Sequence, residues 1–177
     1  MNPYTFHKTT SLADAIAARS EPGGYLLAGG TELLAQMKAG QRTPAKIVDV
    51  KHIPELNRVG EASDGGLEIG AAVSATTLAG HARIQAEHAA LHDSVQLIGS
   101  LQIQNRATLG GNICNAAPSA DAVPALIADR AIARIAGPGG ERTLALEDLF
   151  AGPGKTHLAS GELLVSLTLP KPAARSA

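Results

Sequence analysis

The sequence predicts an α+β fold of two subdomains, a small unit over residues 1–55 and a larger one over residues 56–170, followed by a tail over residues 171–177. Two observations carry this prediction. A short apolar run passes through a glycine pair into a helical pattern at residues 25–38, and two strand-like runs flank a glycine-rich turn at residues 131–146. The first pattern is typical of a βαβ unit, and the second of an antiparallel hairpin.

The first subdomain is expected to alternate strands and helices. Ser11 is followed three residues later by Asp14, an acidic variant of the capping box, so a helix is predicted from there through Ala18. The other expected elements are a short apolar start around Tyr4 and Phe6, a strand at 25–28, a helix at 32–38 and a strand at 47–50. Helices that cross between strands predict that the strands pair in parallel.

The second subdomain is expected to hold a mixed or antiparallel sheet with helices. The expected elements are a strand at 67–70, one or two helices between 76 and 98, a glycine-rich loop at 108–112, a helix at 122–128, strands at 131–136 and 142–146, and a last strand at 163–169. Pro170 ends that last strand because proline lacks the amide that would continue it.

Composition excludes several classes of function. Aromatic residues make up only 2% of the chain, so the core must consist of aliphatic side chains. The net charge of −1, without a basic stripe, argues against nucleic-acid binding. The single cysteine, Cys114, excludes an internal disulfide and cannot alone hold an iron–sulfur cluster. No leader or membrane-length apolar segment is recognisable, so we expect a cytoplasmic protein without a structural metal.

Two glycine-rich stretches are the candidate binding elements. The first, residues 28–32, lies at a strand-to-helix junction, where backbone N–H groups favour a phosphate, although a single such turn is more often only structural. The second, residues 108–112, offers the Thr108 hydroxyl and a glycine backbone, and Asn112 and Asn115 add side-chain donors. Two such stretches could hold two phosphates.

Other polar residues are weaker candidates for a binding or metal site. Asp121 could accept hydrogen bonds from a ribose or a ring N–H, or it could cap the helix at 122–128. His88 and His92 have the spacing of metal ligands, but their segment is typical of an exposed helix face, so we expect surface histidines. Cys114 is expected to be a small core residue close to the binding site.

The order and spacing of these motifs resemble the FAD-binding medium subunit of molybdenum hydroxylases, the xanthine dehydrogenase and carbon monoxide dehydrogenase family. The resembling stretches are residues 27–33 (Leu-Ala-Gly-Gly-Thr-Glu-Leu), residues 69–73, residues 102–113 with Thr108-Leu-Gly-Gly-Asn, residues 115–118 with Asp121, and residues 161–164. Together they extend over nearly the whole chain. The resemblance implies the two-subdomain FAD domain shared with vanillyl-alcohol oxidase-like enzymes.

The resemblance also implies a set of cofactor-binding residues. Residues 27–33 would wrap the FAD pyrophosphate, the second stretch would complete the cradle, and Asp121 would hydrogen-bond the cofactor. Ile98 and Leu164 would flank the flavin and adenine regions. The implied set is Leu27, Ala28, Gly29, Gly30, Thr31, Glu32, Leu33, Ile98, Ala107, Thr108, Gly110, Gly111, Asn112, Asn115, Asp121 and Leu164.

The function implied by the resemblance is electron transfer. Electrons from a molybdopterin-binding large subunit would pass through the two [2Fe–2S] clusters of a small subunit to FAD on this chain, and then to NAD⁺ or another acceptor; no catalytic acid or base is expected. Medium subunits of the family continue into a further domain, so a wall for one face of the flavin is expected to be missing from these 177 residues. The alternatives are a stand-alone flavoprotein oxidoreductase and a cofactor-free interaction module.

Overall fold

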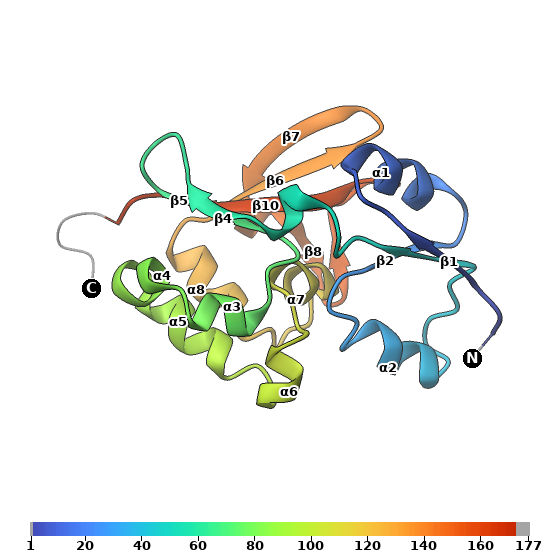
Figure 1. The fold of residues 1–177 in the computed structure, drawn as a ribbon, viewed down its shortest axis with the longest axis horizontal. Helices are drawn as coiled ribbons and strands as arrows, with labels where there is room; N and C mark the ends of the chain where they lie inside the picture. The colour runs from blue at the N-terminus through green and yellow to red at the C-terminus, as the bar shows by residue number, and fades with distance from the viewer. Residues whose placement is uncertain (1, 173–177) are drawn as a thin grey trace.

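The computed structural model describes residues 2–172, which form two β-sheets with helices around them (Figure 1); most of the predicted tail, residues 173–177, lies outside the described residues. The smaller sheet contains β1 (Thr5–Lys8), β2 (Gly24–Leu27) and β3 (Lys46–Asp49) in the order β1-β3-β2. Both of its strand pairs are parallel, as predicted. The crossing helices are α1 (Leu12–Ser20) and α2 (Leu33–Lys38).

Helix α1 begins where the capping pattern predicts. The Ser11 hydroxyl accepts a hydrogen bond from the Asp14 backbone N–H at 3.2 Å, which satisfies one of the amide groups left free at a helix start. Ala15 and Ala18 are buried against the sheets, because α1 packs on β2, β3 and also β6 of the larger sheet. The helix therefore joins the two halves of the molecule.

The larger sheet has five antiparallel strands in the order β4-β5-β10-β6-β7. Its strands are β4 (Val59–Glu61), β5 (Leu67–Gly70), β6 (Ile132–Gly137), β7 (Gly140–Ala145) and β10 (Leu163–Leu169), and the single turn η1 (Pro54–Asn57) connects it to the smaller sheet. The hairpin of β6 and β7 and the last strand are confirmed. The short β4, η2 (Leu146–Leu149) and the pair β8 (Phe150–Gly152) and β9 (Lys155–Thr156) carry no periodic pattern long enough to predict.

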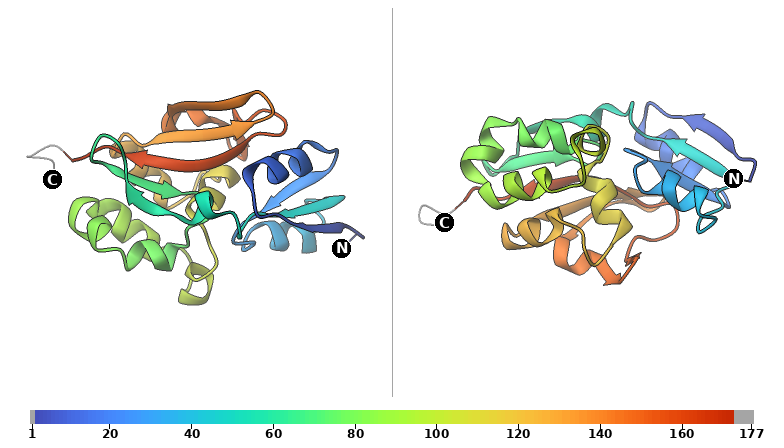
Figure 2. Two further views of the ribbon diagram at one scale, coloured as in Figure 1. Left: turned by 45° about the horizontal axis from the view of Figure 1, so that its top comes forward. Right: turned by 90° about the horizontal axis from the view of Figure 1, so that it is seen from below.

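Six short helices complete the fold, and most of them cover one face of the larger sheet (Figure 2). They are α3 (Ala75–Ala79), α4 (Ala82–Glu87), α5 (Ala89–Gln96), α6 (Leu101–Gln104), α7 (Leu109–Asn115) and α8 (Ala122–Ala128). The prediction of one or two helices between 76 and 98 was wrong, because three are present. Gly80 ends the first, and His88, with φ −133° and ψ 58°, separates the other two.

The glycine-rich stretch at 108–112 is the start of helix α7, not the loop that the sequence predicted. Thr108 has extended backbone angles and its hydroxyl accepts the Gly111 N–H, so the threonine caps the helix and both glycines fall in its first turn. The glycines suggested a loop because they have low helix propensity, but an N-cap and buried neighbours outweigh that preference.

The core is aliphatic, as the composition predicted. Within residues 2–172 no phenylalanine or tyrosine ring is buried, and the largest fully buried side chains are isoleucines and leucines from both sheets and from α3, α4, α5, α7 and α8. The longest helix of this part of the chain, α1, has nine residues, and none could span a lipid bilayer.

His88 is a core residue, which contradicts the expectation of an exposed helix face. The residue is only 3% exposed, and its Nδ1 donates to the Asp129 carboxylate at 2.9 Å. The spacing of apolar residues predicted an exposed His88 because α4 and α5 look like one continuous helix in the sequence. The break between them at His88 turns its side chain towards α8. The pair ties the α4–α5 junction to the end of α8.

We expect His88→Ala to lower the free energy of unfolding by about 2 kcal/mol, because it removes a buried hydrogen bond and leaves a void. Urea denaturation followed by circular dichroism measures the change. His92→Ala, on the next helical turn and bonded only to neighbours in sequence, is the matched control with an expected loss below about 0.5 kcal/mol. Equal losses in the two variants would contradict the assignment of His88 to the core.

Candidate functional site

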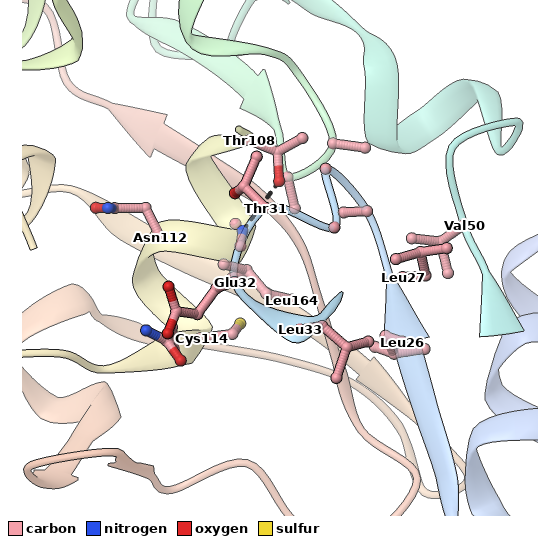
Figure 3. Close-up of a pocket in the computed structure, with 18 of the residues that line it drawn as sticks. Leu26, Leu27, Thr31, Glu32, Leu33, Val50, Thr108, Asn112, Cys114 and Leu164 are labelled. Atoms are coloured by element: carbon pink, nitrogen blue, oxygen red, sulfur yellow. Dashed lines mark hydrogen bonds between the residues drawn. The ribbon is translucent and has the colours of Figure 1, made fainter. Parts of the chain in front are cut away.

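A cavity of about 570 Å³ lies where the β2–α2 connection meets α7, and this volume is in the range of small-molecule sites (Figure 3). Its walls come from both halves of the molecule: residues 25–36 on one side, and residues 71–72, 98–115 and 156–164 on the other. β2 is the edge strand of the smaller sheet, so it borders the cavity directly.

The β2–α2 connection presents a run of free backbone donors. Within residues 2–172 no acceptor pairs with the amide N–H groups of residues 28 to 33, whereas Leu34 N–H, the next along, bonds Gly30 O at 3.2 Å. Gly30 has a φ of +78°, a conformation that favours glycine and that turns successive amides the same way. Residues 28–33 line the cavity and are half-buried or exposed, so their amides stay accessible, and such a segment is suited to an anion with several oxygens.

The start of α7 contributes differently from what the sequence suggested. Its first amides are already paired: Leu109 N–H bonds Val73 O at 3.2 Å, Gly110 N–H bonds Ala71 O at 2.8 Å, and Gly111 N–H bonds the Thr108 hydroxyl. The backbone donors of the cavity therefore come from the first glycine-rich stretch. Because the Thr108 oxygen accepts from Gly111, its own hydroxyl proton is free to be donated into the cavity (Figure 3).

Three glycines shape the two walls of the cavity. A methyl group at Gly29 would collide with the carbonyl oxygen of Arg106, and one at Gly110 would lie 2.6 Å from the Ala71 Cβ. Gly111 is different, because a methyl group there would meet only the Thr108 hydroxyl, at 2.9 Å. Gly29 and Gly110 thus permit close packing, while Gly111 keeps the cavity open.

The two ends of the cavity differ in polarity. The aliphatic end is lined by Val50, Leu56, Ala71, Ala72, Ile98, Ile103 and Ala107. The polar end is lined by Arg19, Tyr25, Gln36, Arg42, Thr156 and Glu162. None of these polar residues was predicted, because they come from five separate segments and no local motif marks them.

Gln36 links the two walls at the polar end. Its side-chain amide donates to Glu32 and to Asn115, both at 3.1 Å, and its oxygen accepts from Arg42 Nε at 3.4 Å. Glu32 and Asn115 are consequently fixed in position, and the Asn115 amide nitrogen stays free because its oxygen is the atom engaged.

Cys114 lines the cavity and is exposed to it, so the expectation of a core residue was wrong (Figure 3). Ile113 fills the core position of that turn of α7, and Cys114 is directed to the opposite side. The protein atoms that surround the thiol raise its pKa from an ordinary 9.0 to about 12, and the nearby Arg19 only partly opposes this. The sulfur is therefore a neutral thiol at physiological pH.

The structure brings every predicted site residue except Asp121 to the cavity wall. Asp121 lies exposed at the start of α8 and makes no capping hydrogen bond, so the capping role that the sequence left open is not observed. Asn112 adds a polar signal of its own, because its side-chain oxygen is buried and has no partner within the described residues. Free amides, a free hydroxyl and this oxygen form a donor and acceptor set that fits a dinucleotide.

An α+β chain with a cavity between a parallel and an antiparallel sheet, lined by free amides and an aliphatic end, has the features of a dinucleotide-binding domain. Residues 2–172 match the family model described as the FAD binding domain in molybdopterin dehydrogenase. The chain belongs to this family, and its cofactor is FAD.

Similar proteins agree with this family. The chain is 39% identical over 168 residues to the xanthine dehydrogenase FAD-binding subunit of Escherichia coli O157:H7, and 32% identical over 169 residues to the carbon monoxide dehydrogenase medium chain of Hydrogenophaga pseudoflava. These matches cover 94% of this chain in each case, and 57% and 58% of the relatives. The reconstituted CO dehydrogenase from Oligotropha carboxidovorans superposes with a TM-score of 0.92 at 30% identity, over 97% of this chain and 60% of that one.

We expect Gly110→Ala to lower the free energy of unfolding by about 1–3 kcal/mol, because the new methyl group overlaps Ala71 and the backbone cannot retreat without losing its bond to Ala71 O. Thermal or urea denaturation measures the loss. The control is Gly139→Ala in the β6–β7 turn, where an added methyl group meets nothing within 4 Å. A Gly110→Ala protein that is as stable as Gly139→Ala or as wild type would refute this packing role.

The raised pKa of Cys114 predicts its reactivity. Because only the thiolate is alkylated, the rate of reaction with iodoacetamide should rise about tenfold per pH unit through pH 10, where an ordinary cysteine has levelled off. The measurement is the labelled fraction against time by mass spectrometry, with a short cysteine peptide as the reference. A plateau near pH 9 would contradict the shift.

Proposed function

We propose that the cavity holds FAD, with the pyrophosphate against the amides of residues 28–33 and facing Thr108 and Gly111. The observation that carries this proposal is the run of unpaired N–H groups on a glycine-containing strand-to-helix connection. A diphosphate offers the several oxygens that such a run requires, and the cationic side chains among the described lining residues, Arg19 and Arg42, lie at the polar end of the cavity.

The polarity of the cavity orients the cofactor. The isoalloxazine ring is large and mainly apolar, so we place it at the aliphatic end beside Ile98, and the adenosine at the polar end beyond the pyrophosphate, beside Leu164. Ile98 and Leu164 are both almost completely buried and provide rigid walls. The proposed contact of Asp121 with the cofactor stays a prediction, because this carboxylate lies at the start of α8.

We further propose that the chain is the electron-transfer subunit of a molybdenum-containing dehydrogenase. Two similar proteins are named as a xanthine dehydrogenase FAD-binding subunit and a carbon monoxide dehydrogenase medium chain. These names support a molybdopterin-binding large subunit and a [2Fe–2S] small subunit as partners. Bound FAD supplies the chemistry, since it can take electrons from one-electron donors and deliver a pair to NAD⁺ or another acceptor. The chain's own residues bind the cofactor and orient it.

The site lacks the features of a complete enzyme. Of its two carboxylates, Glu162 is held by Arg142 at 2.7 Å, which lowers the pKa of Glu162, and Glu32 is bonded to Gln36. Glu162 is therefore a poor general base, and no histidine or lysine lines the cavity within residues 2–172. This favours the subunit over the stand-alone flavoprotein, and the free amides favour a cofactor site over a cofactor-free interaction module.

We expect Gly111→Val to weaken FAD binding at least tenfold while the fold persists, because the side chain fills the space in front of the Thr108 hydroxyl. FAD fluorescence quenching measures affinity, and circular dichroism confirms the fold. Gly111→Ala should give an intermediate loss, and Gly139→Val in the distant turn should give none. Unchanged FAD binding in a folded Gly111→Val protein would remove this cradle from consideration.

Assays on the purified chain distinguish the electron-transfer subunit, the stand-alone flavoprotein and the cofactor-free interaction module. A chain that takes up one FAD, has no turnover on its own, and gains NADH-forming or dye-reducing activity only with its molybdenum and iron–sulfur subunits supports the proposal. Turnover of an organic substrate without partners would favour the stand-alone enzyme. A folded chain that takes up no FAD would favour the interaction module.

A further inference from the structure

An arginine lies on an aromatic ring at the polar end of the cavity. The guanidinium carbon of Arg42 is 5.8 Å from the centre of the Tyr25 ring, within the range of a cation–π contact, and both residues line the cavity. Tyr25 provides the only aromatic ring among the described lining residues, in a chain with two tyrosines and two phenylalanines. The pair therefore forms a planar platform in an otherwise aliphatic and amide-lined cavity.

The platform lies on the opposite side of the amide run from the aliphatic end. Tyr25 pairs with Ile47 near the beginning of the parallel strands, whereas Leu27 pairs with Asp49 at their end, about 7 Å further along β2. The free amides follow Leu27. Along α7, Ala71 of the aliphatic end is bonded to Gly110 in the first turn, whereas Gln36, which holds Arg42, is bonded to Asn115 in the last turn. The order along the cavity is thus platform, amide run, aliphatic end.

The guanidinium is held in orientation and is not neutralised. Its Nε donates to the Gln36 oxygen, and Gln36 is itself fixed by Glu32 and Asn115. Within residues 2–172 no carboxylate forms a salt bridge with Arg42, and the residue is exposed, so one face of its plane is open. A fixed planar cation with an open face is suited to stacking on an aromatic base.

We propose that the Tyr25–Arg42 pair is the platform on which the adenine base of FAD stacks. This inference rests on the proposed function, since it takes the pyrophosphate to lie on the amide run. Adenine follows the pyrophosphate on the side away from the flavin, which is where the order of the cavity places the pair. Its extended π-face matches the arginine plane, and stacking tolerates the absence of base-specific hydrogen bonds.

The test compares two flavins that differ in the adenosine. Wild-type protein, Tyr25→Ala and Arg42→Ala are titrated with FAD and with FMN, which lacks the adenosine monophosphate half. Loss of one stacking partner should weaken FAD binding about tenfold and leave FMN binding unchanged. Arg42→Lys, which keeps the charge but loses the plane, should weaken FAD almost as much as Arg42→Ala.

Two control variants test whether a loss of FAD binding is specific to the Tyr25–Arg42 pair. Tyr4→Ala and Lys38→Ala remove an exposed tyrosine and an exposed cation from the same half of the molecule without touching this cavity, and they should bind both flavins like wild type. Because Arg42 is exposed, its variants keep the test valid if Tyr25→Ala does not fold.

Other outcomes overturn the inference in distinguishable ways. FAD affinity within twofold of wild type in the folded variants would exclude stacking on the pair. Equal weakening of FAD and FMN would place the pair beside the phosphate or the flavin. Wild-type protein that binds neither flavin would overturn the proposed function itself.

Discussion

The structure depends on the close approach of two backbones where the β2–α2 connection crosses the segment before α7. Gly29 lies directly against the Arg106 carbonyl, so any side chain there would force the two walls apart. Within the second wall, Gly110 lies against Ala71, and hydrogen bonds from Gly110 and Leu109 attach the start of α7 to residues 71–73. The cavity exists because the walls meet here and diverge on either side, towards the aliphatic end and towards the polar end.

The crossing also explains why one wall supplies the donors. The amides at the start of α7 are used to attach this helix to residues 71–73, which makes the second wall rigid and leaves it side-chain donors, the Thr108 hydroxyl and the Asn115 amide. The β2–α2 connection follows an edge strand, and its amides have no acceptor within residues 2–172 although Gly29 packs against the Arg106 carbonyl. Rigidity on one side and unsatisfied donors on the other are both needed, because a ligand gains most from donors that cannot rearrange.

Local patterns allowed much of this to be predicted from the sequence. The Ser11 cap, the parallel unit, the β6–β7 hairpin and the last strand depend on residues close together in the chain, and all were confirmed. The errors concern tertiary context. His88 is buried because a helix break turns it, Cys114 faces the cavity because Ile113 takes the core position, and the cluster of Arg42, Tyr25 and Gln36 is assembled from separate segments. No short stretch of the sequence contains both partners of these contacts, so local patterns could not predict them.

The balance of charge in the cavity bears on how an anionic dinucleotide is held there. Glu162 is neutralised by Arg142 and the Glu32 carboxylate is bonded to Gln36, while Arg19 and Arg42 have no carboxylate partner within residues 2–172. The two arginines lie at the polar end and not at the amide run, so the pyrophosphate is met by backbone dipoles and the excess positive charge lies further along. Dipoles in a fixed segment are screened less by salt than mobile surface charges are. Recognition by this cavity therefore depends on the conformation of residues 28–33 more than on net charge, which agrees with a chain whose overall charge is only −1.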